Sequence, residues 1–181
     1  DLSPLQAMAD LQQLYLNNNA INDLTALSEL KALNQLDVSY NLLTSLSPVY
    51  SCTSLTGLYA SNNTITSVTG IEKLTALESF NASFNTLSDI SPVSSCSNLK
   101  ELNVSNNMIS DISSLNGLNN LFTLNFSRNS VTDLPEFEQD CKLVTIDGSH
   151  NLITSLDNLS GLENLNNVYM DDNRAISNVE V

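Results

Sequence analysis

The stretch Leu99-Lys-Glu-Leu-Asn-Val-Ser-Asn-Asn107 decides the fold of this chain, because the same phrase, L-x-x-L-x-L-x-x-N, returns every 22 residues. It opens on a leucine each time: Leu11, Leu33, Leu55, Leu77, Leu99, Leu121, Leu143 and Leu165. Apolar and polar residues alternate within it, which is typical of a strand with one buried face. One such strand cannot bury that face alone, so the period predicts a solenoid whose stacked units form one parallel sheet.

The second half of each unit is also regular, as in Asn85-Thr-Leu-Ser-Asp-Ile-Ser-Pro-Val93 and Asn107-Met-Ile-Ser-Asp-Ile-Ser-Ser-Leu115. Together with the opening phrase, these residues resemble leucine-rich repeat proteins over essentially the whole chain. The repeat length is similar to that of bacterial internalins, and a phosphatase-regulator type from eukaryotic cells shares it. The resemblance implies an α/β solenoid, a horseshoe with a parallel β-sheet on its concave face and short 3-10 or single-turn helices on its convex face.

The unbroken period predicts a single domain over residues 1–181, with no linker and no second domain. Residues 1–10 read as the rear half of a repeat, 11–164 as seven full repeats, and 165–181 as a partial, irregular last repeat. The irregularity follows Asn173, where one extra residue precedes Ile176. Because the chain begins and ends inside a repeat, we expect it to be a piece of a longer protein.

Two polar columns have structural explanations. The ninth position of the phrase is always asparagine, and the resemblance implies a buried ladder that bonds the backbone of its own and the neighbouring unit: Asn19, Asn41, Asn63, Asn85, Asn107, Asn129, Asn151 and Asn173. Four residues later comes an Asp or Ser, which we expect to cap a short helix in every unit: Asp23, Ser45, Ser67, Asp89, Asp111, Asp133, Ser155 and Ser177. Pro48 and Pro92 follow early in that turn, where proline is tolerated.

Charge and cysteine content exclude several classes of function. The chain has 20 acidic and 6 basic residues and a net charge of -14, which disfavours nucleic acid and anionic membranes as partners. No apolar run approaches the roughly 18 residues of a membrane span. Cys52 and Cys96 occupy the same position two units apart, about 10 Å at the usual strand spacing, which is too far for a disulfide. We therefore expect these thiols and that of Cys141 to be reduced and buried.

The concave face offers the candidate binding site, because packing does not dictate its third, fifth, seventh and eighth positions. Aromatic and arginine side chains there favour protein binding, so Tyr15, Tyr59 and Tyr169 are the predicted anchors. Asp37, Glu101 and Asp147 would select a basic partner. The full set of predicted ligand-binding residues is Tyr15, Asp37, Tyr40, Tyr59, Asn81, Phe84, Glu101, Asn103, Asn125, Arg128, Asp147, His150 and Tyr169.

Other side chains on this face have more than one interpretation. Serine fills the seventh position from Ser39 to Ser149, a uniformity that favours a role in the turn after the strand over ligand recognition. Phe122 and Val144 interrupt a polar column at the second position. They either extend the core or form a small exposed apolar patch.

Catalysis and metal binding find little support. Cys141, Asp147 and His150 are the residue types of a thiol nucleophile, an orienting acid and a base, but Cys141 precedes the strand that carries Asp147, and no oxyanion arrangement accompanies it. The chain has one histidine, so a histidine-based metal cage is excluded. Asp171 and Asp172 with Asp147 form either a weak Ca²⁺ site or, more simply, a solvated acidic rim. We expect no enzyme activity, no cofactor and no metal.

The function predicted from the sequence is a non-catalytic protein-binding module of a bacterial cell-surface or secreted protein. Its ligand would be a host or neighbouring-cell protein, or less readily a glycan, bound by a monomer without membrane insertion. The alternative is an intracellular scaffold or regulatory subunit, since the repeats also resemble those of the phosphatase-regulator type.

Overall fold

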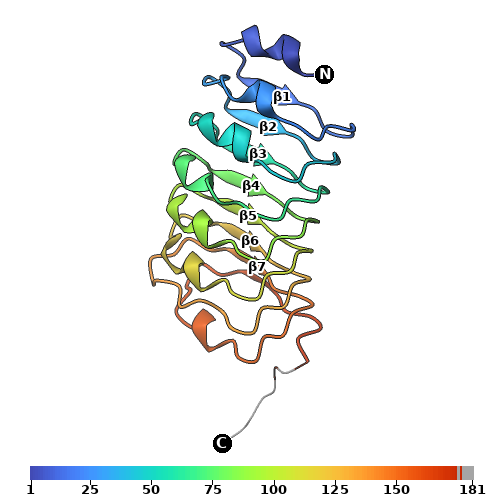
Figure 1. The fold of residues 1–181 in the computed structure, drawn as a ribbon. Coiled ribbons are helices and arrows are strands. Elements are labelled where there is room, and N and C mark those ends of the chain that lie inside the picture. The colour runs from blue at the N-terminus through green and yellow to red at the C-terminus, as the bar shows by residue number, and fades with distance from the viewer. Residues whose placement is uncertain (175, 177–181) are drawn as a thin grey trace, which may run out of the picture.

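A computed structural model describes residues 1–174 and 176. Its eight short strands pair in chain order into one parallel sheet (Figure 1). Each pairing advances the register by one repeat, so that Leu14 lies opposite Leu36 and Leu36 opposite Leu58. The strands are β1 Gln13–Tyr15, β2 Gln35–Asp37, β3 Gly57–Tyr59, β4 Ser79–Asn81, β5 Glu101–Asn103, β6 Thr123–Asn125, β7 Thr145–Asp147 and β8 Asn167–Tyr169. The predicted solenoid with an open parallel sheet is confirmed.

Short 3-10 helices form the other side of the coils (Figure 1). They are η1 Ser3–Ala7, η2 Thr25–Leu27, η3 Ser47–Ser51, η4 Ile71–Lys73, η5 Ser91–Ser95, η6 Ser113–Gly117 and η7 Asp157–Leu159. The expectation of one helix per unit is wrong for the coil between β6 and β7, where the described residues form none. Pro135 occupies the place of Ser113 there. It lacks the amide that Asp133 would bind, and it disfavours helical backbone at Leu134.

The Asp and Ser side chains before these helices act one residue earlier than predicted. The backbone cap of η2 is Leu24, which makes no side-chain cap bond, whereas Asp23 Oδ1 accepts the Thr25 amide at 2.9 Å and the Thr25 hydroxyl at 2.6 Å. These two bonds lower the pKa of the Asp23 carboxyl. The same bond to the amide two residues on is made by Ser45, Ser67, Asp89, Asp111 and Ser155. The Ser177 cap lies outside the described residues.

The core fills the space between sheet and helices. The inward leucines, isoleucines and valines of the inner coils are fully buried and form a single continuous cluster. A large side chain in one coil packs where the next coil has a glycine. Gly148 leaves room for the Phe126 ring, whose Cζ lies 2.5 Å from the position that a Cβ on residue 148 would occupy. At the irregular end, Ile176 packs against the core while partly exposed.

The predicted asparagine ladder is confirmed. Asn85 Nδ2 donates to the Ala60, Ala82 and Ser83 carbonyls, and its Oδ1 accepts the Ile65 amide at 2.9 Å. One side chain thus fixes the turn of its own coil and ties it to the preceding coil. The Asn19 side chain is exposed, and its hydrogen bonds to described residues are the two to carbonyls of its own coil.

All three cysteines are free and buried, as predicted. Burial raises the pKa of each thiol, that of Cys96 to about 11. These thiols therefore pack as small apolar side chains rather than acting as nucleophiles.

Candidate functional site

The fifth position of the phrase forms a straight row across the sheet. The strand register places Tyr15, Asp37, Tyr59, Asn81, Asn103, Asn125, Asp147 and Tyr169 side by side in that order. Tyr15, Tyr59 and Tyr169 therefore lie on one face of the sheet, but they do not meet. Tyr15 and Tyr59 are two strands apart and Tyr169 is five strands beyond, which is about 24 Å at the usual spacing.

A hollow of about 380 Å³ lies in the middle of this row. It brings together the predicted residues Tyr59, Asn81, Glu101, Asn103 and Asn125, and it leaves out Tyr15 and Tyr169. Sequence reasoning did not assign the rest of the lining to the site: Ser79, Phe80, Leu102 and Thr123. We call these nine residues the central hollow. Tyr59 lines it from β3, and the other eight residues lie on the three adjacent strands β4, β5 and β6, which we call its floor.

The three floor asparagines are held in one orientation. Oδ1 of Asn81, Asn103 and Asn125 accepts the backbone amide two residues on, at 3.0 Å in each case. An amide N–H can only donate, so this bond fixes the oxygen toward the turn and the Nδ2 group away from it. Nδ2 makes no hydrogen bond to any described residue. The floor therefore carries three NH₂ groups, one per strand, that are not used in hydrogen bonds between described residues.

The acidic residues of the row are anchored in the same way. Oδ1 of Asp37 accepts the Ser39 amide and Oδ1 of Asp147 accepts the Ser149 amide, at 2.9 and 3.0 Å. Each keeps its second oxygen for a partner. Glu101 is exposed at the hollow and accepts a hydrogen bond from the Ser79 hydroxyl at 3.2 Å. Negative charge thus lies in the hollow and on both sides of it.

The seventh position does not belong to the exposed surface. The serines from Ser39 to Ser149 are buried, and hydroxyls such as that of Ser83 donate to the residue two positions earlier. The inclusion of this column among the free positions is wrong, because the chain already turns inward here. The interpretation of these serines as turn residues is confirmed.

The eighth position lies at the edge of the sheet face, where each strand has ended. Tyr40, Phe84 and Arg128 are exposed there and His150 is half-buried. Arg128 Nη2 lies 3.2 Å from His150 Nε2, and His150 Nδ1 lies 2.9 Å from Asp172 Oδ2. These four predicted residues belong to a surface beside the central hollow rather than to its floor.

The residues considered for catalysis are engaged elsewhere. Asp147 bonds the Ser149 turn, His150 contacts Arg128 and Asp172, and the Cys141 thiol is buried with a raised pKa. Among the residues that the structure describes, no group of three or more His, Cys, Asp or Glu side chains could hold a metal ion. Within the same residues, no helix has the length and apolarity needed to cross a bilayer.

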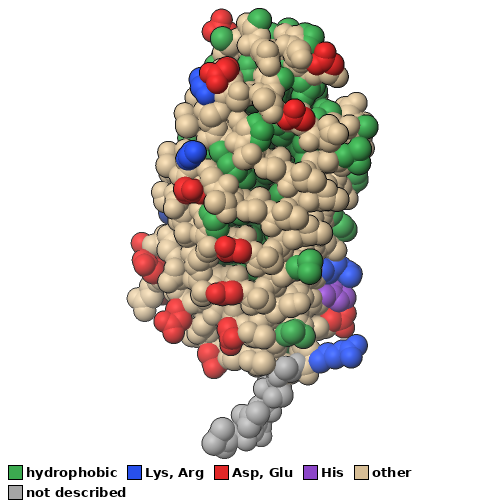
Figure 2. Space-filling view, viewed as in Figure 1, with side chains coloured by type: hydrophobic (Ala, Val, Ile, Leu, Met, Phe, Trp, Pro, Cys, Tyr) green, Lys and Arg blue, Asp and Glu red, His purple; other side chains and the backbone are tan. Residues whose placement is uncertain are grey.

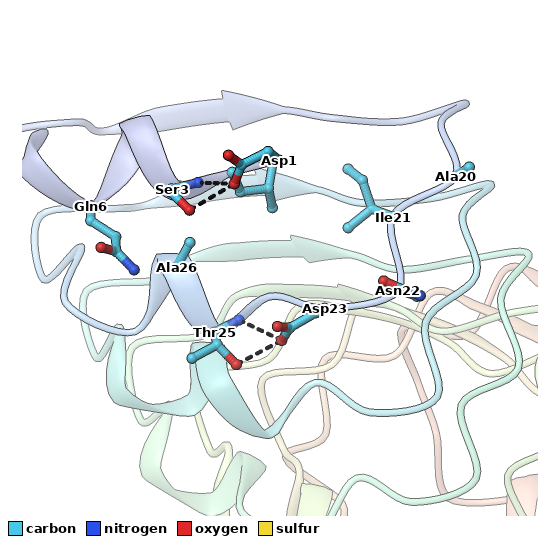
Figure 3. A pocket seen from close by; sticks show the side chains of 10 residues that line it. Asp1, Ser3, Gln6, Ala20, Ile21, Asn22, Asp23, Thr25 and Ala26 are labelled. Atoms are coloured by element: carbon cyan, nitrogen blue, oxygen red, sulfur yellow. Dashed lines mark hydrogen bonds between the residues drawn. The ribbon is translucent and has the colours of Figure 1, made fainter.

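Two further hollows lie outside this row. One of about 360 Å³ lies between η1 and η2, but its carboxylates, Asp1 and Asp23, already bond the turns beside them (Figure 3). The other, of about 280 Å³, lies beside Phe122, with Lys100 and Lys142 in its lining. Phe122 is 52% exposed, so of the two interpretations of this residue the exposed apolar patch is correct.

Comparison with known proteins agrees with this architecture. The family model described as Leucine Rich repeats (2 copies) matches residues 9–51, 53–95, 75–117 and 97–139. No curated protein matches the chain in a sequence search.

Among solved structures, an internalin from Listeria monocytogenes superposes with a TM-score of 0.86 at 27% identity. The match covers 98% of this chain but only 56% of the internalin. Internalin C2 from the same species gives 0.85 at 29% identity, over 92% of this chain and 74% of its own length. A plant peptide hormone receptor, RGFR1 in complex with RGF2, gives 0.80 at 22% identity over 92% of this chain and 29% of the receptor, which is a likeness of fold alone.

Proposed function

The chain belongs to the leucine-rich repeat family, and we propose that it is a non-catalytic protein-binding module whose ligand occupies the concave sheet face at the central hollow. The observation that carries this proposal is the hollow itself. It gathers a half-buried tyrosine, an exposed glutamate and three amide NH₂ groups that have no hydrogen-bond partner among the described residues. Buried structural positions satisfy their polar groups internally, so donors left over on the floor are available for a ligand.

A basic protein surface fits this face best. Glu101 lies in the hollow, and Asp37 and Asp147 keep one free carboxylate oxygen each on either side. The net charge of -14 adds a long-range attraction for cations. The NH₂ groups of the floor would meet backbone or side-chain carbonyl oxygens of the partner, while Tyr59 supplies apolar contact.

The proposed setting is the surface of a bacterial cell or the medium around it. Its support is the likeness to the two Listeria internalins. We further propose that the repeats act as one domain and as a monomer, because one core cluster runs through the coils and a charge of -14 opposes self-association.

The experiment is differential capture. The chain and two variants are immobilised and exposed to a surface-protein extract of host or neighbouring cells, and retained proteins are identified by mass spectrometry. The concave variant is Tyr59→Ser with Glu101→Gln. The control is Glu136→Gln, which removes the same charge from an exposed residue in the segment between β6 and β7.

A partner held by the wild type and by the control variant, but lost from the concave variant, would support the proposal. Calorimetry with that purified partner should then give a Kd at least tenfold weaker for the concave variant. Equal retention by all three proteins would contradict a concave site. Protease treatment of intact source cells tests the location, since a surface protein is digested and an intracellular scaffold is protected.

A further inference from the structure

The backbone at the eighth position of the repeat is left-handed in every coil. Asn18, Tyr40, Asn62, Phe84, Asn106, Arg128, His150 and Asp172 all have φ between 54° and 59°. Asparagine and aspartate tolerate this region because their short side chains bond locally, whereas bulky residues there are conformational outliers and are strained. Tyr40, Phe84 and Arg128 are such outliers in a column where Asn62 and Asn106 show what the turn prefers.

Burial in the core does not offset the strain at these large side chains. Tyr40 is 55% exposed and Phe84 is 52% exposed. Next to them, at the tenth position, stand the exposed apolar residues Leu42, Met108 and Leu152. The two columns adjoin, since Leu152, Asp172 and Arg174 line one hollow. We call the surface formed by Tyr40, Leu42, Phe84, Met108, Arg128, His150 and Leu152 the loop edge.

The loop edge differs in charge from the rest of the molecule. Both arginines of the chain, Arg128 and Arg174, lie on these two columns, and neither column carries a carboxylate before Asp172. Along the right-hand edge of Figure 2, hydrophobic side chains gather in the upper half, and the lower half carries basic side chains with a histidine and an acidic side chain between them. A protein with a net charge of -14 thus keeps one apolar and locally cationic strip.

We propose that the loop edge is a second interaction surface, and that it binds an amphipathic α-helix of a partner protein lying along the solenoid axis. The helix presents apolar residues at heptad spacing to Tyr40 and Phe84 and a carboxylate to Arg128. This proposal does not depend on a ligand at the central hollow, because the two surfaces share no residue.

The spacing of the outliers selects a helix. Tyr40, Phe84 and Arg128 follow one another at intervals of two coils, or about 10 Å at the usual strand spacing. Helix residues seven apart lie on the same face and about 10.5 Å apart. An extended strand repeats its face at about 6.8 Å or twice that, and matches poorly. A helix also has the width to reach the second row, at Leu42 and Met108.

The charge of the edge sets the direction of the helix. A carboxylate two heptads beyond the first apolar contact would meet Arg128, whose guanidinium is exposed and held beside His150. The opposite orientation would place that carboxylate against Tyr40 and an apolar side chain against Arg128. For a helix whose apolar residues precede its carboxylate, one polarity is therefore favoured.

The first measurement is thermal unfolding and needs no ligand. Tyr40→Asn and Phe84→Asn introduce asparagine, the residue that neighbouring coils have at this left-handed position. Because the substitution relieves backbone strain, we expect Tm to stay level or to rise by about 2 to 4 °C. Asn106→Phe, the reverse exchange, should lower Tm. A fall in Tm for both asparagine variants would overturn the proposal, because the Tyr40 and Phe84 rings would then stabilise the fold. An unchanged Tm for Asn106→Phe would show that a bulky residue is not strained in this turn, and would also overturn the proposal.

The second measurement uses a defined probe, a fluorescent 18-residue alanine-based helical peptide. It has leucines at positions 1, 4, 8 and 11 and a glutamate at position 15, and its binding is followed by fluorescence anisotropy. Tyr40→Asn and Phe84→Asn should each weaken its binding at least fivefold, and Arg128→Asn should weaken it and reduce its salt dependence. Tyr59→Ser, in the central hollow, should leave it unchanged. Peptides of the same composition with a central proline or with permuted leucines should bind at least tenfold more weakly.

Equal binding of the helical and proline-containing peptides would overturn the choice of a helix. Binding that is insensitive to the loop-edge variants, or no detectable binding of the helical peptide, would overturn the assignment of the surface. Neither result would touch the capture experiment on the central hollow, so the two proposals fail separately.

Discussion

Replacing Asn85 by alanine tests the ladder on which the alignment of both surfaces depends. The asparagine makes four hydrogen bonds, but they are not equivalent. The Ala60 carbonyl keeps Asn63 as a donor and the Ala82 carbonyl keeps Asn107. The amide of Ile65, which is buried, loses the only acceptor it has in the part of the chain that the structure describes.

An unpaired buried amide costs about 1 to 3 kcal/mol, and the net loss of the other bonds adds about 1 kcal/mol. We expect a loss in the free energy of unfolding of about 2 to 4 kcal/mol, measured by urea titration with circular dichroism. The matched control is Asn19→Ala. The Asn19 side chain is exposed, and its two hydrogen bonds to described residues go to carbonyls of its own coil, so water can replace it, and its loss should stay within about 0.5 kcal/mol.

Asn85→Asp refines the test, because aspartate keeps the acceptor for Ile65 but loses the donor. A buried carboxylate would then face the carbonyl oxygens that the NH₂ group now bonds. At pH 7 this variant should be less stable than the alanine variant, and acidification should reduce the difference. If Asn85→Ala and Asn19→Ala lose the same free energy, or if aspartate proves harmless, the ladder does not hold the coils as argued.

Three further predictions concern the back of the coils and are measured by the same titration. The Tyr50 hydroxyl is buried and has no hydrogen-bond partner among residues 1–174 and 176, so Tyr50→Phe should raise the free energy of unfolding by about 1 kcal/mol; a decrease would reveal a bond to that hydroxyl. Gly70→Ala should lower it by about 2 kcal/mol or more, because φ is 107° and the new Cβ would lie 2.6 Å from the Tyr50 ring. The pKa of Cys96, raised to about 11 by burial, means that the folded chain holds this proton more tightly than the unfolded chain does. Stability should be intact below about pH 9 and fall toward pH 11, and a Cys96→Ala variant that loses stability equally over this range would contradict the assignment.

The sequence was sufficient for the parts of the fold that repeat. The strand, the inward leucines and the asparagine ladder follow from the phrase, because one unit can bury its apolar face only against an identical neighbour. The helix missing after Asp133 was also within reach. Pro135 replaces the residue whose amide is needed, and that substitution is visible without coordinates.

The site was predicted less completely, for a geometrical reason. Register alone placed Tyr15, Tyr59 and Tyr169 in one row, but only the shape of the surface separates Tyr59, which lines the central hollow, from the other two. Burial of the serines at the seventh position depends on how sharply the chain turns after the strand, and the repeat pattern does not predict the angle of that turn. The left-handed backbone at Tyr40 and Phe84 was likewise hidden, although Asn62 and Asn106 at the same position of the neighbouring coils were a signal of it.

The row of fifth positions explains how a repeat protein can build a specific surface without weakening itself. Asn81, Asn103 and Asn125 use one atom of the carboxamide to hold the turn and leave the other for a ligand. Aspartate does the same at Asp37 and Asp147. Exchanging asparagine and aspartate at this position therefore replaces an NH₂ donor on the surface by a negatively charged acceptor, or the reverse. The Oδ1 bond to the backbone amide of the turn is kept in both cases. Asp147→Asn should change the charge preference of the surface with little effect on stability, whereas Asp147→Ala should affect both. Because binding chemistry can change one coil at a time in this way, specificity lies in the departures from the repeat and stability in the repeat itself.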